Sequence, residues 1–507
     1  MSNSRLGRGI KNVTYGIVSQ IIAVILNLLI PRLFILHFGS DVNGLLSFVS
    51  QIFGYFGLIE AGLATSTLTA LYGPIAENDR LHISSILSAS RIYFRRVALY
   101  YLIGTVIFAV VYSIFGTVSL SPTTVLLVIL LQGLAGVVNY LYQAAFRQFL
   151  MADGRAYVLS NIGLLTTIGV NAAKLVAIYS GIGIVAIQLI SLLVVCIQVP
   201  IYYVYMKLNY PWIKFSLKPD FSSLKQRSWI LIHQVSSIIL SGTDIVIVSL
   251  FCGLSVTSIY SVYNLVITGV NLLISTINSS LIFILGQKYH TDQKEYLKLF
   301  DAYNVYFVTF VVALMSICNV LLLPFVQLYT RGADIDYSMK WLPLLFCSVQ
   351  VLSSIRAVSN NLITVAGHFR QTVSRTITEA VINVSASLIL VNCLGIYGVL
   401  LGTCGALLYR SNDIIIYANK KLLNRSPRKT YWPITVNIAL FASSALISSY
   451  INFTVESPGQ MVVVGVLTTL VILPVYLVVV SVTSPQEFHY VWSLVLRRLL
   501  KPKTTDE

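Results

Sequence analysis

The chain has 507 residues, of which 56% are hydrophobic and only 10% are charged, and its mean hydropathy is +0.82. Soluble domains carry about a quarter charged residues. This composition therefore excludes a soluble globular protein and indicates a polytopic membrane protein. The formal net charge of +16 would suit a nucleic-acid partner, but its placement along the chain, described below, predicts no nucleic-acid binding.

Because a membrane-spanning helix needs about 20 apolar residues, the sequence predicts about fourteen spans. In chain order they lie near residues 13–37, 43–72, 97–117, 122–147, 157–180, 182–206, 229–252, 256–286, 303–329, 341–366, 371–393, 396–418, 433–451 and 460–482. The first apolar segment is longer than the apolar core of a signal peptide, and no small-residue cleavage site follows it. We therefore expect the first span to remain in the mature protein.

Most of the 34 basic residues fall between spans on one side of the predicted membrane, for example in the loops 74–96, 207–228, 287–300 and 419–432. On the opposite side we find only Arg331 and Lys340. The positive-inside rule then predicts a multi-pass protein of the cell membrane with both termini in the cytoplasm. Anionic lipid head groups are the partners that such basic loops favour.

One constant offset aligns two distant parts of the chain with two others. It matches "FGSDVNGLLSFVS" (38–50) with "CGLSVTSIYSVYN" (252–264), and it also matches "GIGIVAIQ" (181–188) with "GIYGVLLG" (395–402). The predicted spans fall in corresponding order in the two halves. A duplicated six-span unit is therefore indicated, and because the number of spans is even, both copies should have the same orientation in the membrane.

The predicted fold class is an all-α membrane protein with two pseudo-symmetric six-helix lobes and two additional C-terminal helices. The expected parts are an N-terminal lobe (1–206), a cytoplasmic linker (207–228), a C-terminal lobe (229–420), two further spans (421–484) and a cytoplasmic tail (485–507). In the tail, apolar residues at helical spacing lie opposite Arg497 and Arg498, which predicts an interfacial amphipathic helix.

The eighth span carries a polar stripe that includes Asn264, Asn271 and Asn278 at helical spacing. Small and amide side chains are also the usual material of close helix packing in membranes. Three asparagines on one face favour a hydrated cavity, and we predict that they contact a substrate.

Charges inside spans are the strongest functional signal, because each costs about 2.5–3.5 kcal/mol on insertion scales and usually faces a bundle interior or a cavity. Arg32, Lys174 and Arg356 have no acid at helical spacing in their own spans. We predict that they form a cationic substrate site. The candidate acids for coupling to H⁺ or Na⁺ are Glu60, Asp244 and Glu379.

Two alternatives remain open for these charges. Arg32 would pair with Glu60 if its role were in folding, and Pro31 beside it predicts a kink of the first span. Arg410 and Asp413, three residues apart near the end of a span, have the spacing of a surface helical pair.

No pattern in the sequence predicts an enzyme, a metal site or a cofactor. The six cysteines are scattered through apolar segments without CxxC or Cys/His spacing, and we expect them to be small buried side chains. The sequence contains no phosphate-binding Gly-rich motif and no nucleophile elbow, so no catalytic residue is assigned.

The segment "HFGSDVNGLLSFVSQIFGYFGLIEAGLATSTLTALYGPIAENDR" (37–80), with "ADGRAYVLSNIG" (152–163) and "AGHFRQTVSR" (366–375), resembles the Wzx-type polysaccharide exporters of the multidrug/oligosaccharidyl-lipid/polysaccharide (MOP) superfamily. The resemblance runs over essentially the whole chain. It implies a lipid-linked oligosaccharide flippase that moves an undecaprenyl-pyrophosphate-linked glycan by alternating access for surface polysaccharide biosynthesis. It also implies a polysaccharide polymerase and other assembly proteins as partners.

Three other functions stay open at this point. A peptidoglycan lipid-precursor flippase would use similar cations, whereas a cation-coupled multidrug exporter usually offers acids to its cationic substrates. A membrane glycosyltransferase or polymerase handles the same lipid but would be expected to carry a large outer loop with catalytic acids. The longest predicted outer loop, residues 330–340, is too short for that.

Overall fold

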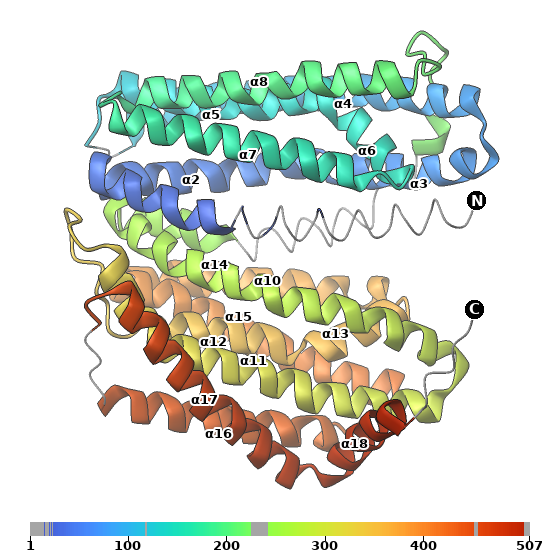
Figure 1. Cartoon of the computed structure of the whole chain (residues 1–507), viewed down its shortest axis with the longest axis vertical. Coiled ribbons are helices and arrows are strands. Elements are labelled where there is room, and N and C mark those ends of the chain that lie inside the picture. Colours follow the sequence, from blue (N-terminus) through green and yellow to red (C-terminus); the bar gives the residue numbers. More distant parts are fainter. Residues whose placement is uncertain are drawn as a thin grey trace. The chain divides into compact units, whose positions relative to one another are not determined.

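The computed structural model describes Tyr15, Gln20, Ile22 and residues 24–116, 119–224, 242–450 and 455–500. Within these residues the chain is all-helical, with 16 α-helices. It divides into two compact units (Figure 1). Unit 1 comprises Met1–Ser249 and Gly253–Ser258, and unit 2 comprises Leu250–Cys252 and Ile259–Glu507.

The membrane-protein fold predicted from the sequence is confirmed. Among the described residues, 11 helices are long and apolar enough to cross a membrane, and two shorter apolar helices, Val24–Phe38 and Gly242–Phe251, lie where the first and seventh spans were expected. Apart from Tyr15, Gln20, Ile22 and Cys252, the other residues of those two expected spans lie outside the described residues. The same holds for the basic residues Arg5, Arg8, Lys11, Lys225, Arg227, Lys501 and Lys503.

The second expected span, near 43–72, is interrupted. It consists of α2 (Ser40–Phe56), a 3₁₀ turn (Gly57–Ile59) and α3 (Ala61–Glu77). Glu60 follows the 3₁₀ turn directly and stands at the N-cap position of α3, without a side-chain capping hydrogen bond. The sequence predicted one continuous helix here, because hydropathy does not report how the backbone turns within an apolar segment.

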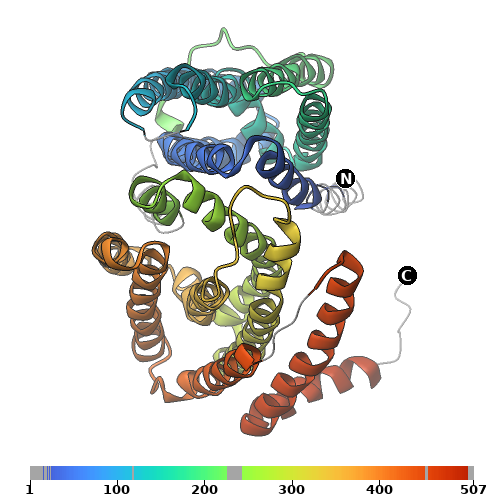
Figure 2. The same ribbon diagram turned by 90° about the vertical axis from the view of Figure 1, so that its left-hand side faces the viewer.

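Unit 1 is built from α2 and α3 together with α4 (Arg80–Phe115), α5 (Pro122–Val138), α6 (Ala144–Ala152), α7 (Ala156–Tyr179) and α8 (Ile184–Asn209). A five-residue π-helix, Asn139–Gln143, joins α5 to α6. Along the unit, α4 packs on α5, α5 on α8, and α8 on α7, and Figure 2 shows these helices nearly end-on. An apolar core of residues from these helices and from Val24–Phe38, with Phe34, Phe48 and Ile187 among its buried members, holds the unit together.

Eight of the nine α-helices described in unit 2 cover the seven spans predicted from residue 256 onwards, with two short helices sharing the span near 341–366. They are α10 (Leu254–Thr291, whose first turn belongs to unit 1), α11 (Gln293–Tyr329), α12 (Leu342–Ile355), α13 (Ala357–Val365), α14 (Phe369–Leu394), α15 (Ile396–Tyr417), α16 (Arg428–Tyr450) and α17 (Pro458–Thr483). The long helix α11 contacts α12, α16 and α17, and α14 packs along α15. The predicted amphipathic tail is helical as α18 (Pro485–Leu500).

The repeat detected in the sequence has a counterpart in unit 1. Ser255, in the first turn of α10, donates a hydrogen bond to the carboxylate of Asp41, at the start of α2, and the two residues are 214 positions apart. This separation equals the offset of the sequence repeat. One turn further, Asn43 donates to the Ser258 hydroxyl at 2.7 Å. The first turns of the two repeat-related helices therefore contact each other.

The contact requires a glycine. A Cβ atom placed on Gly44 would lie 1.9 Å from the carbonyl oxygen of Leu254, which belongs to the backbone and has little freedom to move. We expect Gly44→Ala to destabilise the protein by roughly 1–3 kcal/mol, the range for overpacked sites. Gly73→Ala is the matched control, because no atom lies within 4 Å of a Cβ at that position. Thermal unfolding of the purified protein checks this, and equal melting temperatures for the two variants would contradict it.

The described part of the linker packs on one end of unit 1. The Arg80 guanidinium lies 5.4 Å from the Trp212 ring centroid, and that of Arg91 lies 4.7 Å from the Phe215 ring centroid. Further along, hydrogen bonds from the Ser222 and Ser223 hydroxyls lower the pKa of the Asp220 carboxyl. Some of the basic residues expected in loops thus have a structural role in holding the linker.

Candidate substrate site

A polar cavity of about 460 Å³ lies inside unit 1. We call it the unit 1 cavity. Its lining comes from the helix Val24–Phe38, the π-helix and α6, α7 and α8. The polar and charged side chains among its lining residues are Asn27, Asn139, Gln143, Arg147, Thr166, Thr167, Asn171, Lys174, Gln198 and Tyr202.

The π-helix positions one wall of the unit 1 cavity. Asn139 and Gln143 mark its two ends, and Arg147 follows four residues later on α6, so the three side chains recur at four-residue steps. Isolated π-turns inside membrane helices are frequent at functional sites, because they re-aim side chains and change the backbone hydrogen bonds. In the sequence repeat, with its offset of 214 residues, Tyr142 of this π-helix corresponds to Arg356, which lies between the end of α12 and the start of α13. Both halves therefore have an irregular helix at the same repeat position.

Helix α7 supplies another part of the lining. Gly163, Thr167 and Asn171 repeat every four residues along it, and Lys174 follows within the next turn. The Asn171 amide donates to the Thr167 carbonyl oxygen at 2.8 Å, which fixes that side chain against its own helix. The regular spacing gives this wall hydroxyl, amide and ammonium groups.

The charge of the lining is entirely positive. Among the lining residues in the described ranges, the charged ones are Arg147 and Lys174, and none is a carboxylate. Outside the lining, Glu60 is close enough to Arg147 for the two charges to attract each other. The Gln143 side chain is 1% exposed, and its amide nitrogen has no hydrogen-bond partner among the described residues. Such a cavity suits a ligand that carries negative charge and many hydrogen-bond acceptors.

The predicted cations of unit 1 have different surroundings. Lys174 lines the cavity, and its ammonium lies 5.8 Å from the Phe34 ring centroid. Arg32 is partly buried and forms no ion pair with any residue in the described part of the chain. The alternative pairing of Arg32 with Glu60 is therefore not found, since Arg147 is the cation that acts on Glu60.

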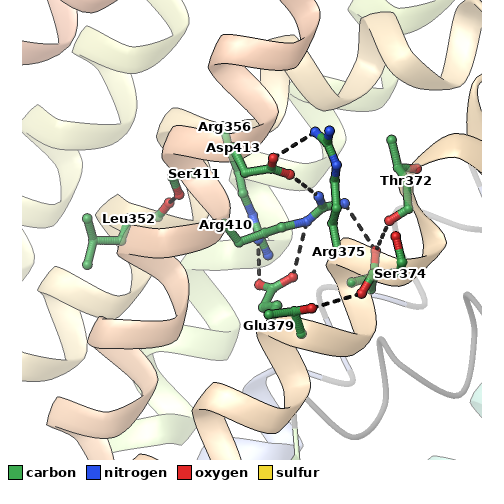
Figure 3. Close-up of polar contacts among 11 residues, drawn as sticks. Leu352, Arg356, Thr372, Ser374, Arg375, Glu379, Arg410, Ser411 and Asp413 are labelled. Atoms are coloured by element: carbon green, nitrogen blue, oxygen red, sulfur yellow. Dashed lines mark hydrogen bonds and ion pairs between the residues drawn. The ribbon is translucent and has the colours of Figure 1, made fainter.

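Arg356 lies in unit 2 within a buried network of ion pairs (Figure 3). Its guanidinium Nη1 lies 2.5 Å from Glu379 Oε1, and Arg410 Nε lies 3.4 Å from Glu379 Oε2. Glu379 is 1% exposed. The sequence predicted Arg356 and Glu379 as site residues but did not predict that they pair. Arg356 lies between α12 and α13 and Glu379 lies on α14, so the pairing depends on how these helices pack.

The same network corrects the interpretation of Arg410 and Asp413 as a surface pair. They do pair, at 2.7 Å, but Arg410 is only 4% exposed. Asp413 also binds Arg375 at 2.7 Å. Three arginines and two carboxylates thus alternate along the chain of contacts in Figure 3. The sequence showed the three-residue spacing but not the neighbouring helices that bury it.

The asparagine stripe of the eighth span is engaged within unit 2. Asn271 accepts a hydrogen bond from the Gln350 amide at 2.9 Å, and Asn278 accepts from Tyr303 at 2.5 Å and from Asn361 at 2.7 Å. Asn264 is partly buried. In unit 1, Asp244 is buried on the short helix Gly242–Phe251. The hydrogen bonds of Asn271 and Asn278 agree with the alternative that the polar stripe serves close helix packing. Substrate contact by these asparagines stays a prediction.

Of the polar and charged residues that line the unit 1 cavity, sequence reasoning identified only Lys174 and missed the others, Gln143 and Arg147 among them. Arg147 lies at the end of the span predicted near 122–147, where basic residues are common. The signal that would have found both was the polar repeat Asn139, Gln143 and Arg147 at four-residue steps in an otherwise apolar segment.

No family model matches the chain, and no curated protein sequence matches it significantly. Solved structures do. A multidrug resistance MATE family transporter of the MOP superfamily, in an inward-facing conformation, aligns with TM-score 0.64 and 14% identity over 80% of this chain and 98% of its own. The lipid II flippase MurJ, in an inward closed conformation, aligns with TM-score 0.61 and 13% identity over 92% of this chain and 98% of its own.

A third structure, a MOP superfamily transporter from Pyrococcus furiosus described by a reverse polarity of its binding pocket, aligns with TM-score 0.52 and 12% identity over 82% of this chain and 93% of its own. These neighbours are transporters and not enzymes. At such identities the likeness concerns the fold. The chain therefore has the fold of the MATE and MurJ transporters of the MOP superfamily.

Proposed function

We propose that this protein is a flippase that moves an undecaprenyl-pyrophosphate-linked oligosaccharide across the cell membrane by alternating access. The proposal rests on the unit 1 cavity, whose charged lining residues, among those that the structure describes, are Arg147 and Lys174. A pyrophosphate needs cations, and Arg offers it two parallel donors. The amide and hydroxyl groups of the lining provide hydrogen bonds to the first sugars.

The charge of the cavity also helps to distinguish the flippase from the alternative functions, a multidrug exporter and a peptidoglycan-precursor flippase. A multidrug exporter for cationic compounds would be expected to line its site with carboxylates, and the part of this lining that the structure describes has none. A peptidoglycan precursor carries the same pyrophosphate, so the charge of the cavity fits it equally well. The two lipid substrates differ in their glycan, and the charge of the cavity does not distinguish between them. The resemblance of residues 37–80 to polysaccharide exporters favours the oligosaccharide.

Three further elements belong to the proposal. The basic loops lie in the cytoplasm with both termini and contact anionic lipids. Transport is coupled to H⁺ or Na⁺, and Glu60 is the acid best placed for this because it acts on Arg147 at the cavity. A polysaccharide polymerase receives the product on the outer side.

The proposal is tested by comparing three substrates in proteoliposomes that contain the purified protein. We expect transfer between leaflets for an undecaprenyl-pyrophosphate oligosaccharide, much less for lipid II, and no uptake of a lipophilic cationic drug. Equal transfer of lipid II would reassign the protein to peptidoglycan synthesis. Uptake of the cation without transfer of either lipid would contradict the proposal, and so would chemical conversion of the lipid-linked sugar without transfer.

A further inference from the structure

A second pocket, of about 440 Å³, lies in unit 2. We call it the α11–α16 pocket, because it forms where the end of α11, the segment before α12 and the end of α16 meet. Its volume is within the range of about 300–1,000 Å³ that is typical of small-molecule sites. Its polar lining side chains are Asn319, Gln327, Ser338, Lys340, Ser448 and Ser449.

Trp341 provides an aromatic surface at this pocket. It is 55% exposed, and the Lys340 ammonium lies 5.6 Å from its ring centroid. Tryptophans near the ends of membrane helices often serve only as interfacial anchors. An anchor alone, however, does not account for a pocket lined by hydrogen-bonding groups.

Several of these groups are available to a ligand. Within the described part of the chain, the Gln327 amide and the Lys340 ammonium have no hydrogen-bond or ion-pair partner. The Asn319 amide nitrogen donates to the Ser448 hydroxyl at 3.3 Å, which leaves the Asn319 carbonyl oxygen able to accept. The described lining thus combines one cation with five neutral hydrogen-bonding side chains, and no carboxylate is among these residues.

This combination matches a sugar. A pyranose ring has an apolar C–H face that packs on an indole ring, and its rim of hydroxyls binds amides and hydroxyls. A phosphate group would favour several cations, and arginine in particular, whereas this pocket has a single lysine. We propose that the α11–α16 pocket binds carbohydrate, with preference for an oligosaccharide that carries a negative charge beside Lys340.

The location supports a role on the outer side. The pocket lies at the end of α11 opposite to its N-terminal Lys294 and Lys298, which were predicted to be cytoplasmic. Lys340 is one of only two basic residues expected outside. Because the positive-inside rule disfavours cations there, a lysine beside a pocket on that side suggests a ligand. The inference concerns binding only and does not depend on the proposed transport activity.

The test uses the purified full-length protein and an array of soluble neutral and acidic oligosaccharides without lipid. We expect acidic oligosaccharides to bind best and Trp341→Ala to weaken all binding about tenfold, as expected for a lost aromatic contact. Lys340→Gln should weaken only the acidic ones. The matched control is Trp432→Ala, since Trp432 is 56% exposed at the start of α16 and lies outside the pocket.

Three outcomes would overturn the inference. These are no oligosaccharide binding by the wild type, equal losses in Trp341→Ala and Trp432→Ala, or capture of phosphatidylglycerol vesicles but no oligosaccharide, which would assign the pocket to a lipid head group. If Trp341→Ala does not fold, Trp341→Phe keeps an aromatic ring and should retain most of the binding. Because no step requires transport, a failed flippase assay leaves this result interpretable.

Discussion

The double variant Arg147→Gln/Lys174→Gln should lose transport of the lipid-linked oligosaccharide while its amount in the membrane stays normal. Both side chains line the unit 1 cavity, and neither forms an ion pair within the described residues. A hydrogen bond to a charged group contributes about 1.5–3 kcal/mol. Each single change should therefore weaken head-group binding by roughly ten- to a hundredfold, and the double change should weaken it further.

Two controls separate binding from folding in this experiment. Arg147→Lys keeps the positive charge near Glu60 but offers no bidentate donor pair, so we expect an intermediate loss. Arg96→Gln removes a cation of unit 1 that lies outside the cavity, beside Tyr93, and should leave binding unchanged. Binding of the radiolabelled lipid to purified protein measures the effect. Wild-type affinity in the double variant would contradict a head-group site here.

Glu379→Gln should strongly destabilise unit 2. Glu379 is the carboxylate between Arg356 and Arg410, and its neutralisation leaves both guanidinium groups without that partner in a buried network. Breaking a buried pair costs about 3–5 kcal/mol. The expected result is a large loss of protein from the membrane and a lower melting temperature. Asp413→Asn should cost less, because the Asp413 side chain is more exposed than that of Glu379. Its partner Arg375 is half-exposed, and its other partner Arg410 keeps Glu379.

A second change makes this result decisive between folding and transport roles. If the network is structural, Arg410→Gln combined with Glu379→Gln should restore part of the stability, because it removes one of the two arginines that have lost their partner. If Glu379 instead binds a coupling ion, Glu379→Gln should be abundant and stable but inactive. Normal abundance of the single variant would thus reject the structural role and return Glu379 and Arg356 to the candidate site.

Hydropathy predicted the helices well because each span is apolar enough to be recognised by itself. The repeat offset predicted which helices correspond, and the Asp41–Ser255 contact has the same separation. Hydropathy does not indicate where the backbone of an apolar segment departs from a regular α-helix. The turn at Gly57–Ile59, the π-helix Asn139–Gln143 and the break at Arg356 all lie within continuous apolar segments, so none of them was expected.

The site was harder to predict than the fold because side chains meet across helices whose rotation and register the sequence does not state. Lys174 was recognised from its charge within a span. Arg147 was overlooked because it lies near a span end, where cations are common. Arg356 and Glu379 were both singled out, but they were assigned separate roles since their helices are distant in sequence. Spacing along one helix identified candidates, and packing decided their partners.

The most direct test of the flippase proposal is photolabelling with an undecaprenyl-pyrophosphate oligosaccharide that carries a photoreactive group beside the phosphates. After irradiation, digestion and mass spectrometry of the labelled protein, we predict adducts on the cavity walls, at Thr167 and Asn171 of α7 and at Gln198 of α8. An excess of unlabelled lipid should suppress them, and a lipophilic cation should not. Adducts confined to unit 2, or suppression by the cation, would contradict an anionic head-group site in the unit 1 cavity.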